Sequence, residues 1–190
     1  MKILSKLILK LLGWRIITEI PPDLKKYVVA VAPHTSWKDF PLGLLVRATM
    51  HRNIFYLGKK ELFDGPFGFF FWSTGGRPVD RKHHTGLVDQ VAKLFAGSNE
   101  FAIAIAPEGT RQKVSDLKSG FYFMARKAGV PIIPCALDYE HKTVHFLKPF
   151  YPTEDTEKDL DTIWGFFKGV KGARPEHGIE GERKKLVVSS

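Results

Sequence analysis

His34 and Asp39, five positions apart, form a pair of side chains that could transfer a proton. A histidine with a carboxylate beside it can take a proton from a hydroxyl group, because the carboxylate orients the imidazole and stabilises its charged form. Both lie in the run His-Thr-Ser-Trp-Lys-Asp, directly after the apolar run 27–32. Within one helix the two side chains would point to different faces, so we expect His34 in a loop and Asp39 in the first helical turn. The pattern predicts a general base at a strand-to-helix turn.

A second group of polar residues follows the apolar run 101–106, in the string Pro-Glu-Gly-Thr-Arg that ends at Arg111. Glycine lets such a loop turn tightly, and arginine offers planar, charge-assisted donors to a phosphate or a carboxylate. Two further blocks accompany these: residues 75–81 read Gly-Gly-Arg-Pro-Val-Asp-Arg, and residues 130–134 read Val-Pro-Ile-Ile-Pro. Each block alone has little specificity, and their order along the chain is more informative.

Taken in order, the four blocks resemble those of the glycerolipid acyltransferases, the family that contains lysophosphatidic acid and glycerol-3-phosphate acyltransferases. The resemblance spans residues 34–134. In that family the first block is a His, four residues and an Asp, often with a serine two after the His, where this chain has Ser36. The second block ends in Asp-Arg, here at Arg81, the third is Pro-Glu-Gly-Thr-Arg, and the fourth is an apolar strand between prolines, here Pro131 and Pro134.

The resemblance implies an O-acyltransferase of phospholipid biosynthesis that needs no bound cofactor. Its donor would be a thioester, acyl-CoA or acyl-acyl carrier protein, and its acceptor a lysophospholipid, with 1-acyl-glycerol-3-phosphate expected. His34 would be the base and Asp39 its orienting partner. The implied acceptor and phosphate ligands are Arg81, Glu108, Gly109, Thr110 and Arg111. Departures from the family at Pro33, Ala106 and Gln112 leave the acceptor open, and an acceptor without phosphate, such as an amino-acid lipid, is the alternative.

A net charge of +9 suits either nucleic acid or an anionic membrane surface. The N-terminus favours the membrane, because apolar residues recur there at helical spacing with lysines opposite them. The apolar positions are Ile3, Leu4, Leu7, Ile8, Leu11 and Trp14, and the lysines are Lys2, Lys6 and Lys10. This segment is too short and too charged to span a bilayer, so we expect a peripheral or monotopic protein at the cytoplasmic face. The alternative is a helix that simply packs on the domain.

An aromatic stretch at residues 66–72 carries no charge. Packing in the core is one interpretation. The other is contact with the acyl chain or with lipid, as an exposed apolar patch would indicate. The residues concerned are Phe67, Phe69, Phe70 and Trp72.

The remaining pattern predicts a single layered α/β domain, with a central mixed sheet flanked by helices and preceded by the amphipathic helix. We expect a membrane-association segment at residues 1–20, the acyltransferase domain at 21–175 and a polar tail at 176–190. The expected strands are 27–32, 54–57, 101–106, 132–137 and 144–147, and the expected helices are 37–50, 85–96, 117–128 and 160–170. The single cysteine, Cys135, lies in an apolar strand and is expected to be buried. Without a Cys and His cluster, we expect no metal site.

Two rival functions remain at this stage. A nucleic-acid-binding module is favoured by charge and aromatic content, but the basic-aromatic strand motif of single-strand binders is missing. A serine hydrolase could use the same His and Asp, but the sequence contains no Gly-x-Ser-x-Gly elbow.

Overall fold

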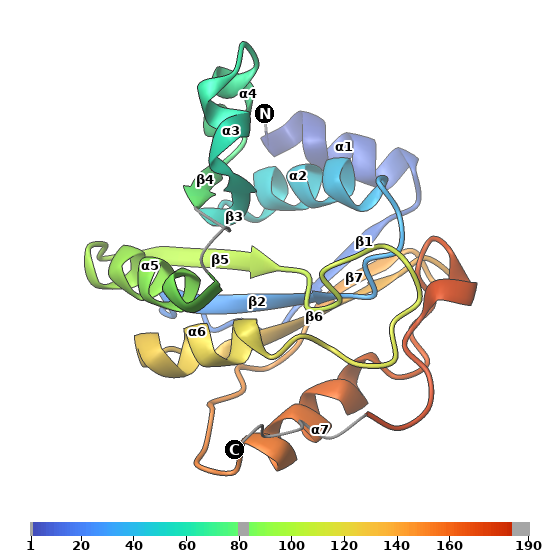
Figure 1. Cartoon of the computed structure of the whole chain (residues 1–190). Coiled ribbons are helices and arrows are strands. Elements are labelled where there is room, and N and C mark those ends of the chain that lie inside the picture. The colour runs from blue at the N-terminus through green and yellow to red at the C-terminus, as the bar shows by residue number, and fades with distance from the viewer. Residues whose placement is uncertain (1, 80–83, 184–190) are drawn as a thin grey trace.

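Within the residues that the computed structural model describes, 2–79 and 84–183, seven strands form one sheet in the order β1-β7-β6-β2-β5-β3-β4 (Figure 1). The strands are β1 (Arg15–Thr18), β2 (Lys26–Ala32), β3 (Ile54–Lys59), β4 (Gly76–Val79), β5 (Phe101–Ile105), β6 (Ile132–Asp138) and β7 (Thr143–Phe146). Neighbouring strands are parallel except β6 and β7, which are antiparallel. The expected mixed sheet is therefore confirmed.

Helices cover both faces of the sheet (Figure 1). They are α1 (Lys2–Leu11), α2 (Asp39–Met50), α3 (Lys60–Asp64), α4 (Gly68–Ser73), α5 (His84–Ala96), α6 (Gly120–Ala128) and α7 (Thr156–Phe167), with a short 3₁₀ turn, η1, at Pro175–His177. One apolar core joins α1 and α2 to the sheet, and the other joins α5, α6 and α7 to its opposite face. The α/β class predicted from the sequence is confirmed.

Strand β2 lies in the middle of the sheet and is buried on both faces. Val28 and Ala30 pack into the core under α5 to α7, whereas Tyr27 and Val29 pack into the core under α2. This alternation follows from the two-residue period of a strand. Because parallel strands β5 and β6 flank β2, the carboxyl ends of all three lie at one edge of the sheet. The loop that begins at Pro33 is thus held between two other loops.

The sequence pattern did not predict β1, β4, α3 or α4. These four elements are too short to give a long periodic signal, and β1 also has mostly exposed residues at the sheet edge. Helix α6 begins at Gly120 rather than at residue 117, because the loop after β5 continues to Ser119. Helix α7 begins earlier than predicted, at Thr156, because the Asp155 side chain accepts a hydrogen bond from the Lys158 amide.

Helix α1 is amphipathic, and only a narrow stripe of it is buried. Leu9 and Ser5 pack against α2, while Ile3 and Leu11 are 84% and 77% exposed. The larger part of the apolar face predicted from the sequence is therefore open to the surroundings. No helix in the described part of the chain combines the length and apolar character needed to cross a bilayer.

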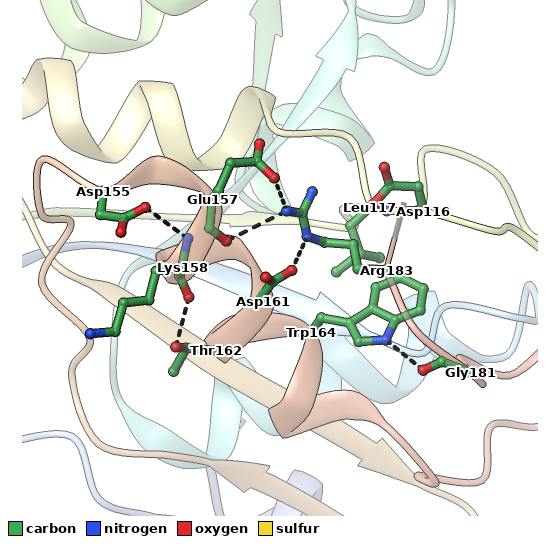
Figure 2. Close-up of polar contacts among 10 residues, drawn as sticks. All are labelled: Asp116, Leu117, Asp155, Glu157, Lys158, Asp161, Thr162, Trp164, Gly181 and Arg183. Carbon is green, nitrogen blue, oxygen red and sulfur yellow. Dashed lines mark hydrogen bonds and ion pairs between the residues drawn. The ribbon is translucent and has the colours of Figure 1, made fainter. Parts of the chain in front are cut away.

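The stretch expected to be a polar tail, residues 176–190, is held against the domain at Ile179, Gly181 and Arg183 within its described part. The Arg183 guanidinium bonds to Glu157 and Asp161 on α7, and the Trp164 indole donates to the Gly181 carbonyl at 3.1 Å (Figure 2). Ile179 is 1% exposed and belongs to the core under α7. The chain thus runs back along α7, an arrangement that the Gly, Lys and Glu content of this stretch concealed.

Candidate active site

Polar residues that could form a site lie at the carboxyl ends of three neighbouring strands. His34 follows β2, Glu108 and Arg111 follow β5, and Tyr139 directly follows β6. In open α/β sheets this edge is where ligand-binding loops gather. A cavity of about 990 Å³ opens at this edge, and His34 and Arg111 both line it.

The structure brings His34 and Asp39 together. His34 Nδ1 lies 2.9 Å from Asp39 Oδ2, and the aspartate side chain is 2% exposed while the histidine side chain is 23% exposed. Helix α2 begins at Asp39, so the carboxylate sits in the first turn, and its Oδ2 also accepts the Ser36 amide at 3.0 Å. The other oxygen, Oδ1, accepts the Tyr139 hydroxyl at 2.6 Å. With Nδ1 on the carboxylate, the Nε2 of His34 remains for a substrate.

These contacts keep Asp39 ionised. Burial raises the pKa of the Asp39 carboxyl, but hydrogen bonds from His34, Tyr139 and the Ser36 amide outweigh burial and hold its pKa below the ordinary value. Burial and the bond to Asp39 in turn raise the pKa of the Tyr139 phenol, so it stays protonated and donates. A charged carboxylate fixed on three sides can orient an imidazole and stabilise its protonated form.

Glu108 contacts the backbone of His34, a member of the His34–Asp39 dyad, and does not line the cavity. It is 3% exposed, and its Oε1 accepts the His34 amide at 2.6 Å. Its Oε2 is buried and has no hydrogen-bond partner among the residues that the structure describes. Burial raises the pKa of the Glu108 carboxyl. The contact ties the loop after β5 to the loop after β2, and Glu108 is absent from the residues that line either of the two cavities beside His34.

The other residues predicted to hold the acceptor lie on the cavity wall. Gly109, Thr110 and Arg111 line it, and Gly109 has a φ of +65°, in the left-handed region that glycine favours. Arg81 lies outside the described residues. No Asp or Glu occurs among the described residues lining the cavity, whereas three cations, Arg111, Lys118 and Arg174, do. The cavity is suited to an anion.

A second, apolar cavity of about 240 Å³ lies between α2 and the sheet and also reaches the dyad. His34, Asp39, Arg47 and Arg111 are also among the described residues that line it. Its walls are mostly aliphatic and aromatic, with Val29, Val31, Phe40, Leu44, Val46, Cys135, Leu137 and Phe146 among them. Cys135 is buried, as expected. The site therefore joins a cavity with cationic side chains on its wall to a smaller apolar cavity at His34.

The comparison with protein families matches this part of the molecule. The model of the family described as Acyltransferase matches residues 15–138, a range that includes His34, Asp39 and Arg111. The chain belongs to the acyltransferase family.

Individual relatives in the acyltransferase family agree with the assignment. The chain is 30% identical over 141 residues to the 1-acyl-sn-glycerol-3-phosphate acyltransferase of Haemophilus influenzae, an alignment that covers 71% of this chain and 58% of that protein. It is 39% identical over 85 residues to the enzyme of the same name from Escherichia coli, covering 41% of this chain and 34% of that protein. The chain thus spans less than two thirds of the length of these relatives.

A solved acyltransferase shares the fold. The crystal structure of the 1-acyl-sn-glycerophosphate (LPA) acyltransferase from Thermotoga maritima superimposes with a TM-score of 0.59 at 18% identity. The superposition covers 87% of this chain and 74% of that one.

Three site residues were not predicted from the sequence. Tyr139 follows the expected strand 132–137 closely, and a polar aromatic residue at a strand's carboxyl end is the signal that could have found it. Lys118 lies in a stretch predicted as helix, and it instead lies over Gly109 in the loop after β5. Arg174 reaches the cavity from the segment after α7, and no local pattern marks it.

The aromatic stretch lies apart from both cavities. Phe67, Phe69, Phe70 and Trp72 are between 42% and 73% exposed, and none of them lines the described walls of either cavity. Packing in the core is therefore not their role. Among the described residues, the one group able to hold a metal ion is Asp138, Glu140 and His141, at the end of β6 and the turn to β7, and none of the three lines either described cavity wall.

Proposed function

We propose that this chain is an O-acyltransferase that moves a fatty acyl group from an acyl thioester to the free hydroxyl of 1-acyl-glycerol-3-phosphate. The observation that carries the proposal is the His34–Asp39 pair, joined at 2.9 Å where a cationic cavity meets an apolar one. An acceptor with a phosphate and a donor with an acyl chain need these two environments on either side of one base. The names of the relatives support the same acceptor.

In this proposal His34 Nε2 takes the proton of the acceptor hydroxyl, and the oxygen attacks the thioester carbonyl carbon. The C–S bond then breaks, the new ester forms, and the thiolate takes the proton back from the imidazolium. Asp39 holds the imidazole tautomer and stabilises the imidazolium between the two steps. Tyr139 and the Ser36 amide hold Asp39, and Glu108 fixes the His34 backbone.

The chain's own side chains act as general base and binding groups, without an acyl-enzyme. Ser36, two residues after the base, is 8% exposed, and its hydroxyl accepts the Lys38 amide at 3.3 Å. A serine in this position serves the turn that leads into α2. This favours direct transfer over the serine hydrolase considered from the sequence.

The apolar cavity suits the acyl chain and the cationic cavity suits the phosphate. Arg111 lines both cavities, as His34 does, so both residues lie where the two cavities meet. We infer that Arg111 binds the acceptor phosphate, together with Arg81. Gly109 and Thr110 would present the backbone and hydroxyl beside it. Glu108 acts in this scheme by positioning His34 and not as an acceptor ligand.

The enzyme would work at an anionic membrane surface, where its lipid acceptor lies. The exposed apolar side chains of α1 stand beside exposed lysines of the same helix, a composition suited to the interface of a bilayer. The exposed aromatic side chains of α4, Phe69, Phe70 and Trp72, add a second apolar area. These features support peripheral attachment, as expected from the sequence.

Product analysis with the purified protein tests the proposal. Acyl-CoA or acyl-acyl carrier protein would be offered with 1-acyl-glycerol-3-phosphate or with a matched monoacylglycerol, and products would be identified by mass spectrometry. We expect phosphatidate from the phosphorylated acceptor at a much higher rate than diacylglycerol from the other. Release of free fatty acid without acceptor would indicate a hydrolase. Equal rates on both acceptors would show that the enzyme does not recognise the acceptor phosphate.

A further inference from the structure

The segment after α7 forms a closed loop whose two ends meet. The Gly169 amide donates to the Ile179 carbonyl at 3.4 Å, and Ile179 is buried in the core. The residues that follow are fixed to α7 by Trp164 and Arg183 (Figure 2). Residues 169–179 therefore form a compact loop on a fixed base. We refer to it as the 169–179 loop.

The tip of the 169–179 loop lies on both loops of the active site. The Arg174 amide donates to Thr35 Oγ1 at 3.0 Å, and His177 Nδ1 donates to the Arg111 carbonyl at 2.8 Å. A Cβ at Gly172 would lie 2.6 Å from Thr35 Oγ1, so a glycine is needed for this close approach. The loop is thus a wall of the site, although it lies outside residues 15–138 matched by the family model.

Positively charged side chains converge from three separate segments on the cationic cavity. Arg111 comes from the loop after β5, Lys118 from the residues before α6, and Arg174 from the 169–179 loop. In the described part of the chain none of the three forms an ion pair, and no described acidic side chain lines the cavity. Lys118 lies over the active-site loop, since a Cβ at Gly109 would be 2.8 Å from its Nζ. Cations left without carboxylates in a concave site favour an anionic ligand.

We propose that Arg174, together with Lys118 on the wall of the same cavity, forms a subsite for the phosphate ester of a substrate, in addition to Arg111. This inference rests on the proposed function. A guanidinium can bind phosphate with two parallel hydrogen bonds, and its backbone amide is anchored one residue from the base, on Thr35. Phosphate held there keeps its substrate close to His34. Both the lysophosphatidate acceptor and the phosphopantetheine arm of the donor carry such a phosphate.

The test uses Arg174→Ala, Arg174→Lys and a matched control, Lys168→Ala. Lys168 is the exposed residue between α7 and the 169–179 loop, and it lines neither described cavity wall. Replacing it removes one positive charge without changing a residue of the site. Two pairs of substrates separate the two sources of phosphate. The acceptor pair is 1-acyl-glycerol-3-phosphate and monoacylglycerol, and the donor pair is acyl-CoA and acyl-pantetheine.

We expect Arg174→Ala to raise the KM of one phosphorylated substrate by about tenfold or more, the effect of losing one charge-assisted contact. The KM of its partner without phosphate should not move. Arg174→Lys should show a smaller rise in KM, because lysine keeps the positive charge but lacks the two parallel donors of the guanidinium. The substrate pair in which the KM of the phosphorylated member rises shows whether Arg174 binds the phosphate of the acceptor or that of the donor. Unchanged KM values for all four substrates, or an equal change in Lys168→Ala, would overturn the proposal.

Calorimetric titration separates this inference from the proposed function. Coenzyme A and a short-chain lysophosphatidate would be titrated into His34→Ala, with and without Arg174→Ala, where no turnover is needed. Weaker binding of one ligand on loss of Arg174 supports the subsite even if the wild type transfers no acyl group. Equal binding in both proteins counts against the subsite, even if the wild type is an active acyltransferase. Circular dichroism confirms that the variants are folded.

Discussion

Removing the Tyr139 hydroxyl tests how far the dyad depends on its neighbours. Tyr139→Phe deletes the 2.6 Å bond to Asp39 Oδ1 and keeps the ring, which packs edge-on against Trp14 at 4.8 Å between centroids. A hydrogen bond to a charged group contributes about 1.5 to 3 kcal/mol, and partial exposure of Tyr139 places this bond toward the lower end. At about 1.4 kcal/mol per factor of ten, we expect kcat to fall roughly tenfold. Tyr139 lines neither described cavity wall, so the KM values of both substrates should stay unchanged.

The same variant has a defined pH dependence. The lowered pKa of Asp39 stabilises the fold at pH values above its ordinary value of 3.8, and this contribution is lost as the pH falls through the folded-state pKa. Without the hydroxyl the Asp39 pKa rises, so part of the contribution disappears. We expect the difference in unfolding free energy between wild type and Tyr139→Phe to be largest at about pH 7 and to narrow near pH 3.

Steady-state kinetics and urea unfolding of Tyr139→Phe and Tyr122→Phe measure these effects. Tyr122 makes a comparable bond, to Asp159 Oδ2 at 2.8 Å, and lines neither described cavity wall. We expect Tyr122→Phe to lower stability and to leave kcat unchanged. A wild-type kcat in Tyr139→Phe, or an equal loss of kcat in Tyr122→Phe, would refute the positioning role.

Three further predictions concern phosphate binding, the membrane and Glu108. Arg111→Ala should raise the acceptor KM about tenfold and leave the donor KM unchanged, with partial recovery in Arg111→Lys, as steady-state kinetics would show. Replacing exposed Ile3 and Leu11 together with Ser should reduce flotation with anionic vesicles, whereas Phe166→Ser on α7 should not, and salt should weaken binding of the wild type. Glu108→Gln keeps an acceptor for the His34 amide and should retain more activity than Glu108→Ala. Because the Glu108 pKa is raised, the unfolding free energy of the wild type should fall as the pH rises from about 4.5 to the folded-state pKa of this carboxyl. Unfolding curves of Glu108→Gln should lack this fall.

The main part of the fold could be predicted because its strands give clear signals. The apolar runs at β2, β5 and β6 stand before loops with distinctive residues, and a buried parallel strand needs just such a run. The contact of His34 with Asp39 could also be predicted, since a loop followed by a first helical turn brings both side chains to one place. The burial of Glu108 could not, because a carboxylate in a post-strand loop is usually exposed.

The remaining elements depend on long-range contacts that leave little local trace. Tyr139 bonds to Asp39 across 100 positions of sequence, and Arg174 to Thr35 across 139. Arg183 is buried by Glu157 and Asp161 in a stretch whose composition is that of a solvated tail. In each case the polar side chain finds its partner only after the sheet and α7 have assembled.

Thioester turnover by His34→Ala shows whether His34 is the general base of the reaction. Release of coenzyme A from acyl-CoA, in the presence of 1-acyl-glycerol-3-phosphate, would be followed for wild type and for the variant, with circular dichroism to show that both are folded. Losing a general base costs roughly a hundredfold to ten-thousandfold in rate, so we predict a loss in that range that depends on the acceptor being present. Turnover by folded His34→Ala at a rate close to that of the wild type would show that His34 is not the general base.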